Sequence, residues 1–161
     1  MTRVTLPQQM KVVEALAPAA DAAGRSSDIV SLKHAGKVYI VVSLSQGNAA
    51  TVALTLMQAQ DVSGTGAKAV ANAVPIWANL DTSISDTLIR RTDAVSYTTD
   101  AGVKNKQVIF EIDPVNLDFN NGFDCVYFTT GASNAANITA ALFILADLRY
   151  QQETPPSAII D

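Results

Sequence analysis

The sequence has little charge and few reactive side chains. Charged residues make up 16% of its 161 residues, whereas an average globular domain has about a quarter. It has one cysteine, Cys125, and one histidine, His34. A single cysteine excludes an internal disulfide framework, and a histidine in a glycine-containing loop without a nucleophile or acid nearby in the sequence does not indicate a hydrolytic triad. We therefore expect no enzymatic activity, no catalytic residues, no metal ligands and no cofactor.

Basic clusters and long apolar runs are also missing. The net charge is −4 and the isoelectric point is about 4.8, and basic residues come together only at 90–91 and 104–106. Nucleic-acid binding depends on many basic contacts to phosphates, so this class of partner is not expected. No run approaches the ~18 apolar residues of a membrane span, and residues 1–7 lack the apolar segment of a signal peptide. We expect no membrane partner and synthesis in the cytoplasm.

A surface this poor in charge suits a protein that neighbours cover in an assembly. Like charge keeps free proteins apart in solution, and here Ala, Ser, Thr, Asn and Gln replace it. The other interpretation is an alanine-rich domain that stays free in solution or is secreted.

Two stretches, 37–60 and 124–148, repeat one pattern. Each has an apolar run rich in β-branched or aromatic residues, then a small polar turn, then a second apolar run. Both turns contain Asn-Ala-Ala, at 48–50 and at 134–136. The pattern is typical of a β-hairpin, so we predict two hairpins that face each other across one core. The predicted core residues are Val42, Leu54, Leu56, Phe110, Val126, Leu142 and Ile144.

The rest of the chain supports an all-β fold. Period-two segments and turn signals about every ten residues predict an antiparallel β-sandwich with Greek-key or jelly-roll connections. We expect one domain over residues 1–150. Residues 17–27 are expected to form a loop because Pro18 and Gly24 interrupt them, and Pro75 is expected to end a strand. Residues 151–161 are predicted to be an extended arm, since Pro155 and Pro156 cannot donate ladder hydrogen bonds.

The residues that we expect to bind a partner are expected to contact another protein. Trp77 lies beside Pro75, and the tip of the arm is apolar at Ile159 and Ile160; with Pro155 and Pro156 they form the predicted interface set. The segment 81–86 faintly resembles a calcium loop but lacks its glycine and distal glutamate, so turn capping by Asp81 is the preferred interpretation.

Several blocks together resemble a known family. They are LAPAADAAGR (16–25), QGNAATVAL (46–54), VPIWAN (74–79), DTL (86–88) with TDAVS (92–96), GFDC (122–125), TGASNAANIT (130–139), and RYQQ (149–152) with TPPSA (154–158). The family consists of small proteins encoded in the head-gene modules of tailed bacteriophages and prophages, near the major capsid gene. The resemblance covers nearly the whole chain.

The resemblance implies a virion structural protein without catalytic residues. It implies a capsid decoration or minor capsid (cement) protein on the capsid surface, with the major capsid protein as its partner. Self-association is also expected, with a trimer as the first choice because capsid lattices offer three-fold sites. The alternatives are another virion component (head-completion, head–tail connector or tail protein) and a carbohydrate-binding β-sandwich that uses Trp77, Tyr97 and the loop at Asp81.

Overall fold

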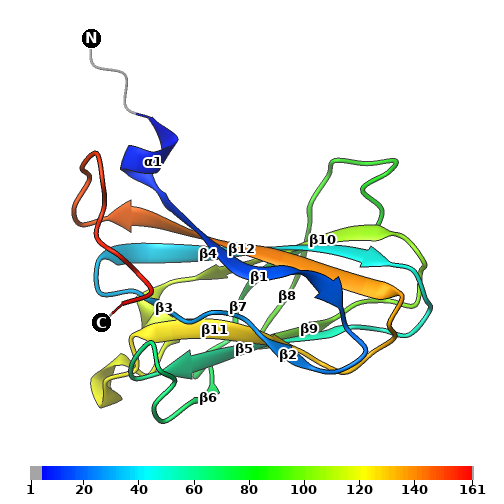
Figure 1. Cartoon of the computed structure of the whole chain (residues 1–161), viewed down its shortest axis with the longest axis horizontal. Coiled ribbons are helices and arrows are strands. Elements are labelled where there is room, and N and C mark those ends of the chain that lie inside the picture. Colours follow the sequence, from blue (N-terminus) through cyan, green and yellow to red (C-terminus); the bar gives the residue numbers. More distant parts are fainter. Residues whose placement is uncertain (1–4, 161) are drawn as a thin grey trace.

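The computed structural model describes residues 5–160, and these form two antiparallel sheets packed face to face (Figure 1). Within these described residues, helical structure is limited to three short elements, α1 (Leu6–Gln9), η1 (Pro114–Asn116) and η2 (Phe119–Asn121). The predicted all-β sandwich is therefore confirmed.

Sheet A has six strands in the order β1-β12-β4-β10-β7-β8. Their bounds are Lys11–Ala20 (β1), Asn137–Leu148 (β12), Ala35–Gln46 (β4), Asn105–Ile112 (β10), Val74–Asn79 (β7) and Ile89–Ala94 (β8). Sheet B has β2-β11-β5-β6, with β3 on β11 and β9 on β5. Their bounds are Arg25–Ser26 (β2), Cys125–Thr130 (β11), Ala53–Ala59 (β5), Lys68–Ala69 (β6), Val30–Ser31 (β3) and Ser96–Thr98 (β9).

The two predicted hairpins, 37–60 and 124–148, are wrong as pairings. β4 lies in sheet A and β5 in sheet B, and β11 and β12 are divided in the same way. Ladders form between the repeats instead, β4 with β12 and β5 with β11. The connections at 47–52 and 131–136 are longer than the two-residue loop of a tight β-hairpin. Each therefore crosses from one sheet to the other, and the apolar faces of its two strands meet across the core.

The core fills the space between the sheets. Of the predicted core residues, Val42, Leu54, Leu56, Phe110 and Val126 are fully buried. The prediction is wrong for β12, where Ala141, Phe143 and Leu145 point inward, Leu142 is 43% exposed and Ile144 is half-buried. β12 is apolar on both faces, and a register shifted by one residue turns every side chain to the opposite face. Alternation alone could not identify its inner face.

Prolines occur within two strands where loops or strand ends were expected. Residues 17–20 belong to β1, an edge strand whose register shifts between Leu16 and Ala19, around Pro18. Pro75 lies inside β7, and the pairing with β8 shifts between Val74 and Ile76. An edge position or a bulge tolerates proline because no ladder donor is needed there. The prediction of a loop over 17–27 is thus wrong at both ends, where the residues belong to β1 and β2. The prediction that Pro75 ends a strand is also wrong.

Candidate interaction surface

The repeated Asn-Ala-Ala turns are structural. The side-chain oxygen of Asn48 accepts a hydrogen bond from the N–H of Ala50, and that of Asn134 accepts one from Ala136, both at 2.9 Å. These turns contact each other through Asn137, whose side chain accepts from the N–H of Asn48 at 2.9 Å and donates to the carbonyl of Ala50 at 2.8 Å. The sequence repeat therefore joins the two sheets at one end of the sandwich.

A buried lysine lies near these turns and is fully hydrogen-bonded. The Nζ of Lys106 donates to the Gln46 side chain at 2.8 Å, to the Asp100 carbonyl at 2.9 Å and to the Asp100 carboxylate at 2.5 Å. These bonds use all three donors of the ammonium group. The same ammonium group lowers the pKa of Asp100. Lys106 is therefore a structural cation that has no donor left for a ligand.

The carboxylates of Asp81 and Asp118 are bonded to the protein itself. Asp81 accepts from the N–H of Ser83 at 3.1 Å and pairs with Lys104 at 2.6 Å, and this pair lowers the pKa of Asp81. Asp118 pairs with Lys68 at 2.5 Å. Within residues 5–160, no group of three or more His, Cys, Asp or Glu side chains is arranged to hold a metal ion. The turn-capping role predicted for Asp81 is what the geometry shows.

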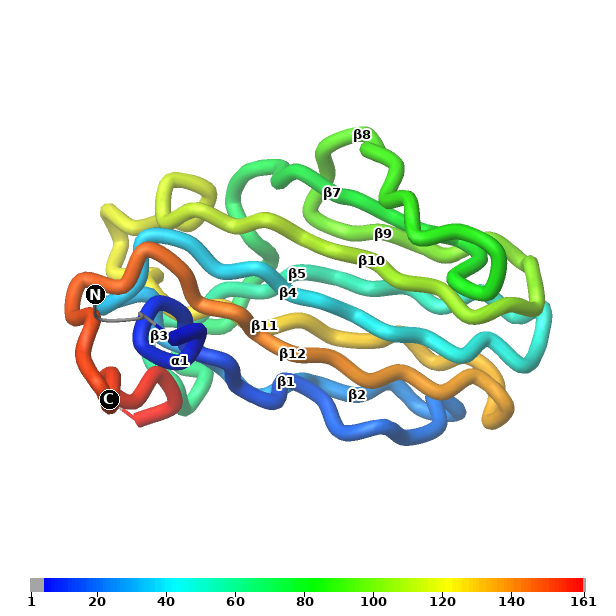
Figure 2. Tube along the Cα trace, turned by 90° about the horizontal axis from the view of Figure 1, so that it is seen from above, coloured from blue at the N-terminus to red at the C-terminus, as the bar shows by residue number. Residues whose placement is uncertain are grey.

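Trp77 lies on the outer face of sheet A, away from the arm. Its indole is half-buried, and the Arg90 guanidinium lies 5.3 Å from the ring centroid. Its strand β7 is separated from β12 by β10 and β4, whereas the C-terminal segment lies at the end of the sheet beside α1 (Figure 2). The structure therefore does not bring Trp77 and residues 155–160 into one site.

The outer face of sheet A is apolar over its central strands, a feature that the sequence reasoning missed. Antiparallel sheets with one solvated face usually alternate apolar inward and polar outward residues. Here Val12 is 47% exposed and Leu142 is 43% exposed. Around them on the same face lie the outward residues Val41, Ser43, Ile109, Ile138, Ala140 and Ile144. None of these side chains carries a charge, whereas Glu14, opposite Leu142, and Glu111 border them on the same face. We call this set the outer patch.

A shallow groove crosses the outer patch. It consists of two adjoining hollows of about 350 Å³ and 340 Å³ that share Ser43 and Gln107 on their floor. Glu14 and Pro18 of the bulged strand β1 form one wall. Thr82, Ser85 and Asp86, from the loop after β7, form the other. The groove therefore has a neutral floor and a carboxylate at each side.

The C-terminal segment, which has no helix or strand, packs on its own domain. Its path begins where Arg149 N–H donates to the His34 carbonyl at 2.9 Å. Farther along, the N–H of Ser31 donates to the Ala158 carbonyl at 2.8 Å, and Lys11 Nζ donates to the Pro155 carbonyl at 3.1 Å. Ala158 is only 5% exposed and belongs to the main core. Prolines prevent a β-ladder here. Single backbone hydrogen bonds and apolar packing hold the segment without one.

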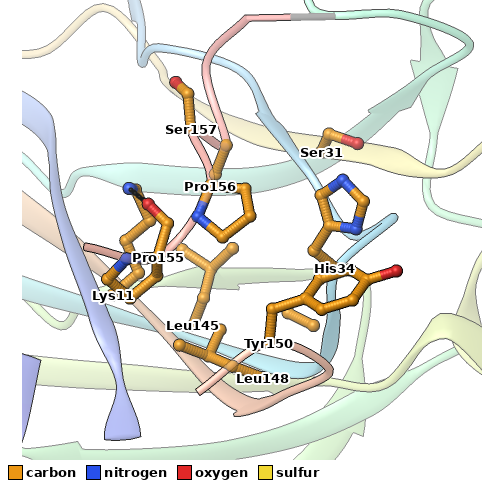
Figure 3. A pocket seen from close by; sticks show the side chains of 11 residues that line it. Lys11, Ser31, His34, Leu145, Leu148, Tyr150, Pro155, Pro156 and Ser157 are labelled. Carbon is orange, nitrogen blue, oxygen red and sulfur yellow. Dashed lines mark hydrogen bonds between the residues drawn. The ribbon is translucent and has the colours of Figure 1, made fainter. Parts of the chain in front are cut away.

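We call the site that receives this segment the tail groove (Figure 3). Its walls come from β1, the β3–β4 connection and β12, and they are Lys11, Ser31, His34, Ala35, Leu145 and Leu148. Tyr150 closes it against His34, with ring centroids 5.4 Å apart. The space left over is about 10 Å³, room for about one water. Residues 155–158 therefore fill the tail groove almost completely.

The tip of the chain does not share in this packing. Ile159 is 46% exposed and Ile160 is 70% exposed. Pro155 also lines a second hollow with Pro7, Met10 and Val12. The tail groove is thus bordered by an apolar rim, which we define as Leu6, Met10, Val12, Tyr150, Ile159 and Ile160.

Comparison with known proteins gives likenesses of structure only. No protein-family model and no curated protein matches the sequence. The SPBc2 prophage-derived protein YomS is similar with a TM-score of 0.47 and 11% identity over 85% of this chain and 93% of that one. A Triatoma virus empty-capsid chain has a TM-score of 0.42 and 12% identity over 98% and 97%. The CBM22-2 xylan-binding domain of Paenibacillus barcinonensis Xyn10C has a TM-score of 0.33 and 11% identity over 86% and 91%. At these values none of them assigns a function.

A membrane-spanning helix is not found in the described part of the chain. The longest α-helix there is α1, with four residues.

Proposed function

We propose that this protein is a virion structural protein of a tailed bacteriophage, and that it binds the major capsid lattice as a decoration or minor capsid protein. The observation that supports it is the outer patch. Exposed apolar surface that is contiguous and free of charge is typical of protein interfaces, whose buried centres are depleted of charged residues. The family resemblance of the sequence blocks points to the same role.

The geometry of sheet A suits repeated docking on a flat shell. Its central strands β12, β4 and β10 are joined by continuous ladders, with each strand pairing along most of its length. Side chains fixed on a sheet lose little conformational freedom on binding, so less of the binding energy is lost in ordering them. Such a protein functions by burying surface against its partner, and it needs no reactive group.

The test is binding to particles released by the bacterium whose genome carries the gene. Mass spectrometry of purified particles should find the protein in a fixed copy number, and an electron-microscopic map should place it on the capsid surface. Density at the portal axis or the tail would instead favour a head-completion, connector or tail protein. Absence from the particles would contradict both roles.

A matched pair of variants links binding to the outer patch. Leu142→Asp places a charge in the patch, whereas Ser96→Asp places one at an exposed strand position of sheet B. Added to heads that lack the protein, Leu142→Asp should bind at least tenfold more weakly and Ser96→Asp should bind like the parent. Equal binding by both variants would exclude the outer patch as the docking surface.

A second candidate function is carbohydrate binding in the groove over the outer patch. The hydroxyl and amide groups of Ser43, Ser85 and Gln107 line its hollows, and such groups supply the directional contacts of a small-molecule site. Retention of the protein on a glycan array, abolished by Gln107→Ala, would favour this function. A blank array would exclude it for the glycans tested.

A further inference from the structure

We propose that the tail groove is an exchangeable self-association site, and that its occupant in the assembled protein is the segment 155–160 of a second copy. The proposal goes beyond lattice binding, because it concerns contacts between copies of this chain. The only residue of the outer patch that it uses is Val12, which also belongs to the apolar rim.

The first argument is that the tail makes the same contacts in its own groove or in a neighbour's. The bonds from Ser31 to Ala158 and from Lys11 to Pro155 join the tail to residues far away in the sequence. A second copy offers the same donors in the same geometry. Exchange of an identical element between copies therefore sacrifices no contact and is a low-cost route to an oligomer.

The second argument is that the connection to the tail can open. Residues 151–154 are exposed, and the one hydrogen bond found among them, from the Gln152 side chain to the Thr154 carbonyl at 2.6 Å, is internal. Within the described chain they make no hydrogen bond to the sandwich. Six residues, 149–154, can span about 20 Å when extended. Pro155 and Pro156 then keep the leading part of the tail extended whichever groove it enters.

The third argument concerns the apolar rim. In a single copy, Ile159 is 46% exposed and Ile160 is 70% exposed. Exchange of tails holds two copies side by side, so the exposed rim residues of one copy, among them Leu6 and Val12, lie near those of the other. Burial of this apolar area between the copies favours the exchanged form. A single copy has no second rim to cover its own.

The experiment uses full-length chains and a photoreactive group. Ile159 is replaced by p-benzoylphenylalanine, and equal amounts of ¹⁴N- and ¹⁵N-labelled protein are unfolded, mixed and refolded together. After irradiation, about half of the cross-links from position 159 should join a light chain to a heavy one, as random exchange between copies requires. The matched control is the same group at Ile84, which is 81% exposed in the loop after β7, and it should give no light–heavy links to the tail groove.

Sedimentation of two full-length variants gives a second measurement. Ala158→Asp places a charge where the tail is buried, and Ser96→Asp places one at an exposed position of sheet B, outside the tail groove. The first variant should sediment as a monomer at concentrations where the parent and Ser96→Asp are oligomeric. The proposal is overturned if the parent is monomeric at about 100 μM, if cross-links join only chains of one isotope, or if Ala158→Asp associates like the parent. Failure here leaves capsid binding by the outer patch untouched, since that is measured with Leu142→Asp.

Discussion

Asn48 and Asn137 hold the two repeats of the chain together: the N–H of Asn48 donates to the side chain of Asn137, although the two residues lie 89 positions apart in the sequence. Asn137 is completely buried, and its amide nitrogen also donates to the Ala50 carbonyl and the Ser133 hydroxyl. One side chain thus bonds to both connections between the sheets.

Replacement of Asn137 by alanine should destabilise the fold. It leaves the Asn48 N–H without this acceptor, whereas the Ala50 carbonyl keeps the donors Gln46 and Ser133. Loss of one partner of a buried hydrogen bond costs about 1–3 kcal/mol. Urea unfolding followed by circular dichroism measures the loss. Asn120→Ala, at an exposed position, is the control and should change the free energy of unfolding by less than about 0.5 kcal/mol. Equal stability of the two variants would show that the bonds of Asn137 are unimportant.

Two leucines test the register of the sheets. Leu54→Ala removes a fully buried side chain and should cost about 2–5 kcal/mol. Leu142→Ala removes an outer one and should cost less than about 1 kcal/mol, because no cavity forms. Denaturant unfolding of both variants is the measurement. A larger loss at Leu142 would mean that β12 turns its other face to the core.

The pair of Asp100 and Lys106 predicts an acid-sensitive end of the sandwich. The folded pKa of Asp100 lies below its ordinary value of 3.8, chiefly because of the hydrogen bond from Lys106. A depressed folded pKa means that the stabilisation is present above about pH 3.8 and is lost as the pH falls through the lower, folded value. The melting temperature of the parent should therefore fall in this acid range.

The melting temperature of Asp100→Asn, measured from pH 2 to 6, should fall less than that of the parent as the pH is lowered. Asp86→Asn, which changes an exposed carboxylate without an ion pair in the described chain, is the control and should keep the slope of the parent. Parallel curves for the parent and Asp100→Asn would contradict the assignment.

Arg25 secures the edge strand β1. Its guanidinium bonds the carboxylate of Asp21, which is fully buried, and the carbonyl of Thr139 on β12. Arg25→Ala leaves a buried carboxylate unpaired and should cost about 3 kcal/mol. Arg149→Ala, at an exposed position, should cost little. Thermal unfolding of both variants is the measurement. If both variants lose the same small amount of stability, the ion pair of Arg25 does not stabilise the fold.

The sequence predicted the fold class but not the strand partners. Apolar alternation in runs such as 38–44 indicates which residues can lie in a strand. The same alternation occurs whether the next strand pairs with this one in a hairpin or crosses to the other sheet. The choice between them depends on the geometry of the connection, where Asn48 and Asn134 form local turns that look the same in either case.

The candidate surface was predicted only in part, for a related reason. Leu142 and Ile144 were assigned to the core because they are apolar, and the rule that apolar residues are inside fails for a face that is apolar but exposed. Trp77 was predicted to be an interface residue, and one of its neighbours on the sheet, Ile109 of β10, lies far along the chain. The tail was predicted to be extended because prolines exclude a ladder. Its packing on its own domain depends on the small side chain of Ala158, which no sequence pattern identifies.

The pairing of β1 with β12 determines when this protein can fold during its synthesis. Lys11 lies opposite Leu145, so β1 is synthesised well before the strand that pairs with it. Translation proceeds at about 5–20 residues per second, and during that time the apolar side chains of β1 have no partner strand. Sheet A can therefore form completely only after β12 has left the ribosome, and we expect chaperones that bind exposed strands to recognise the nascent protein.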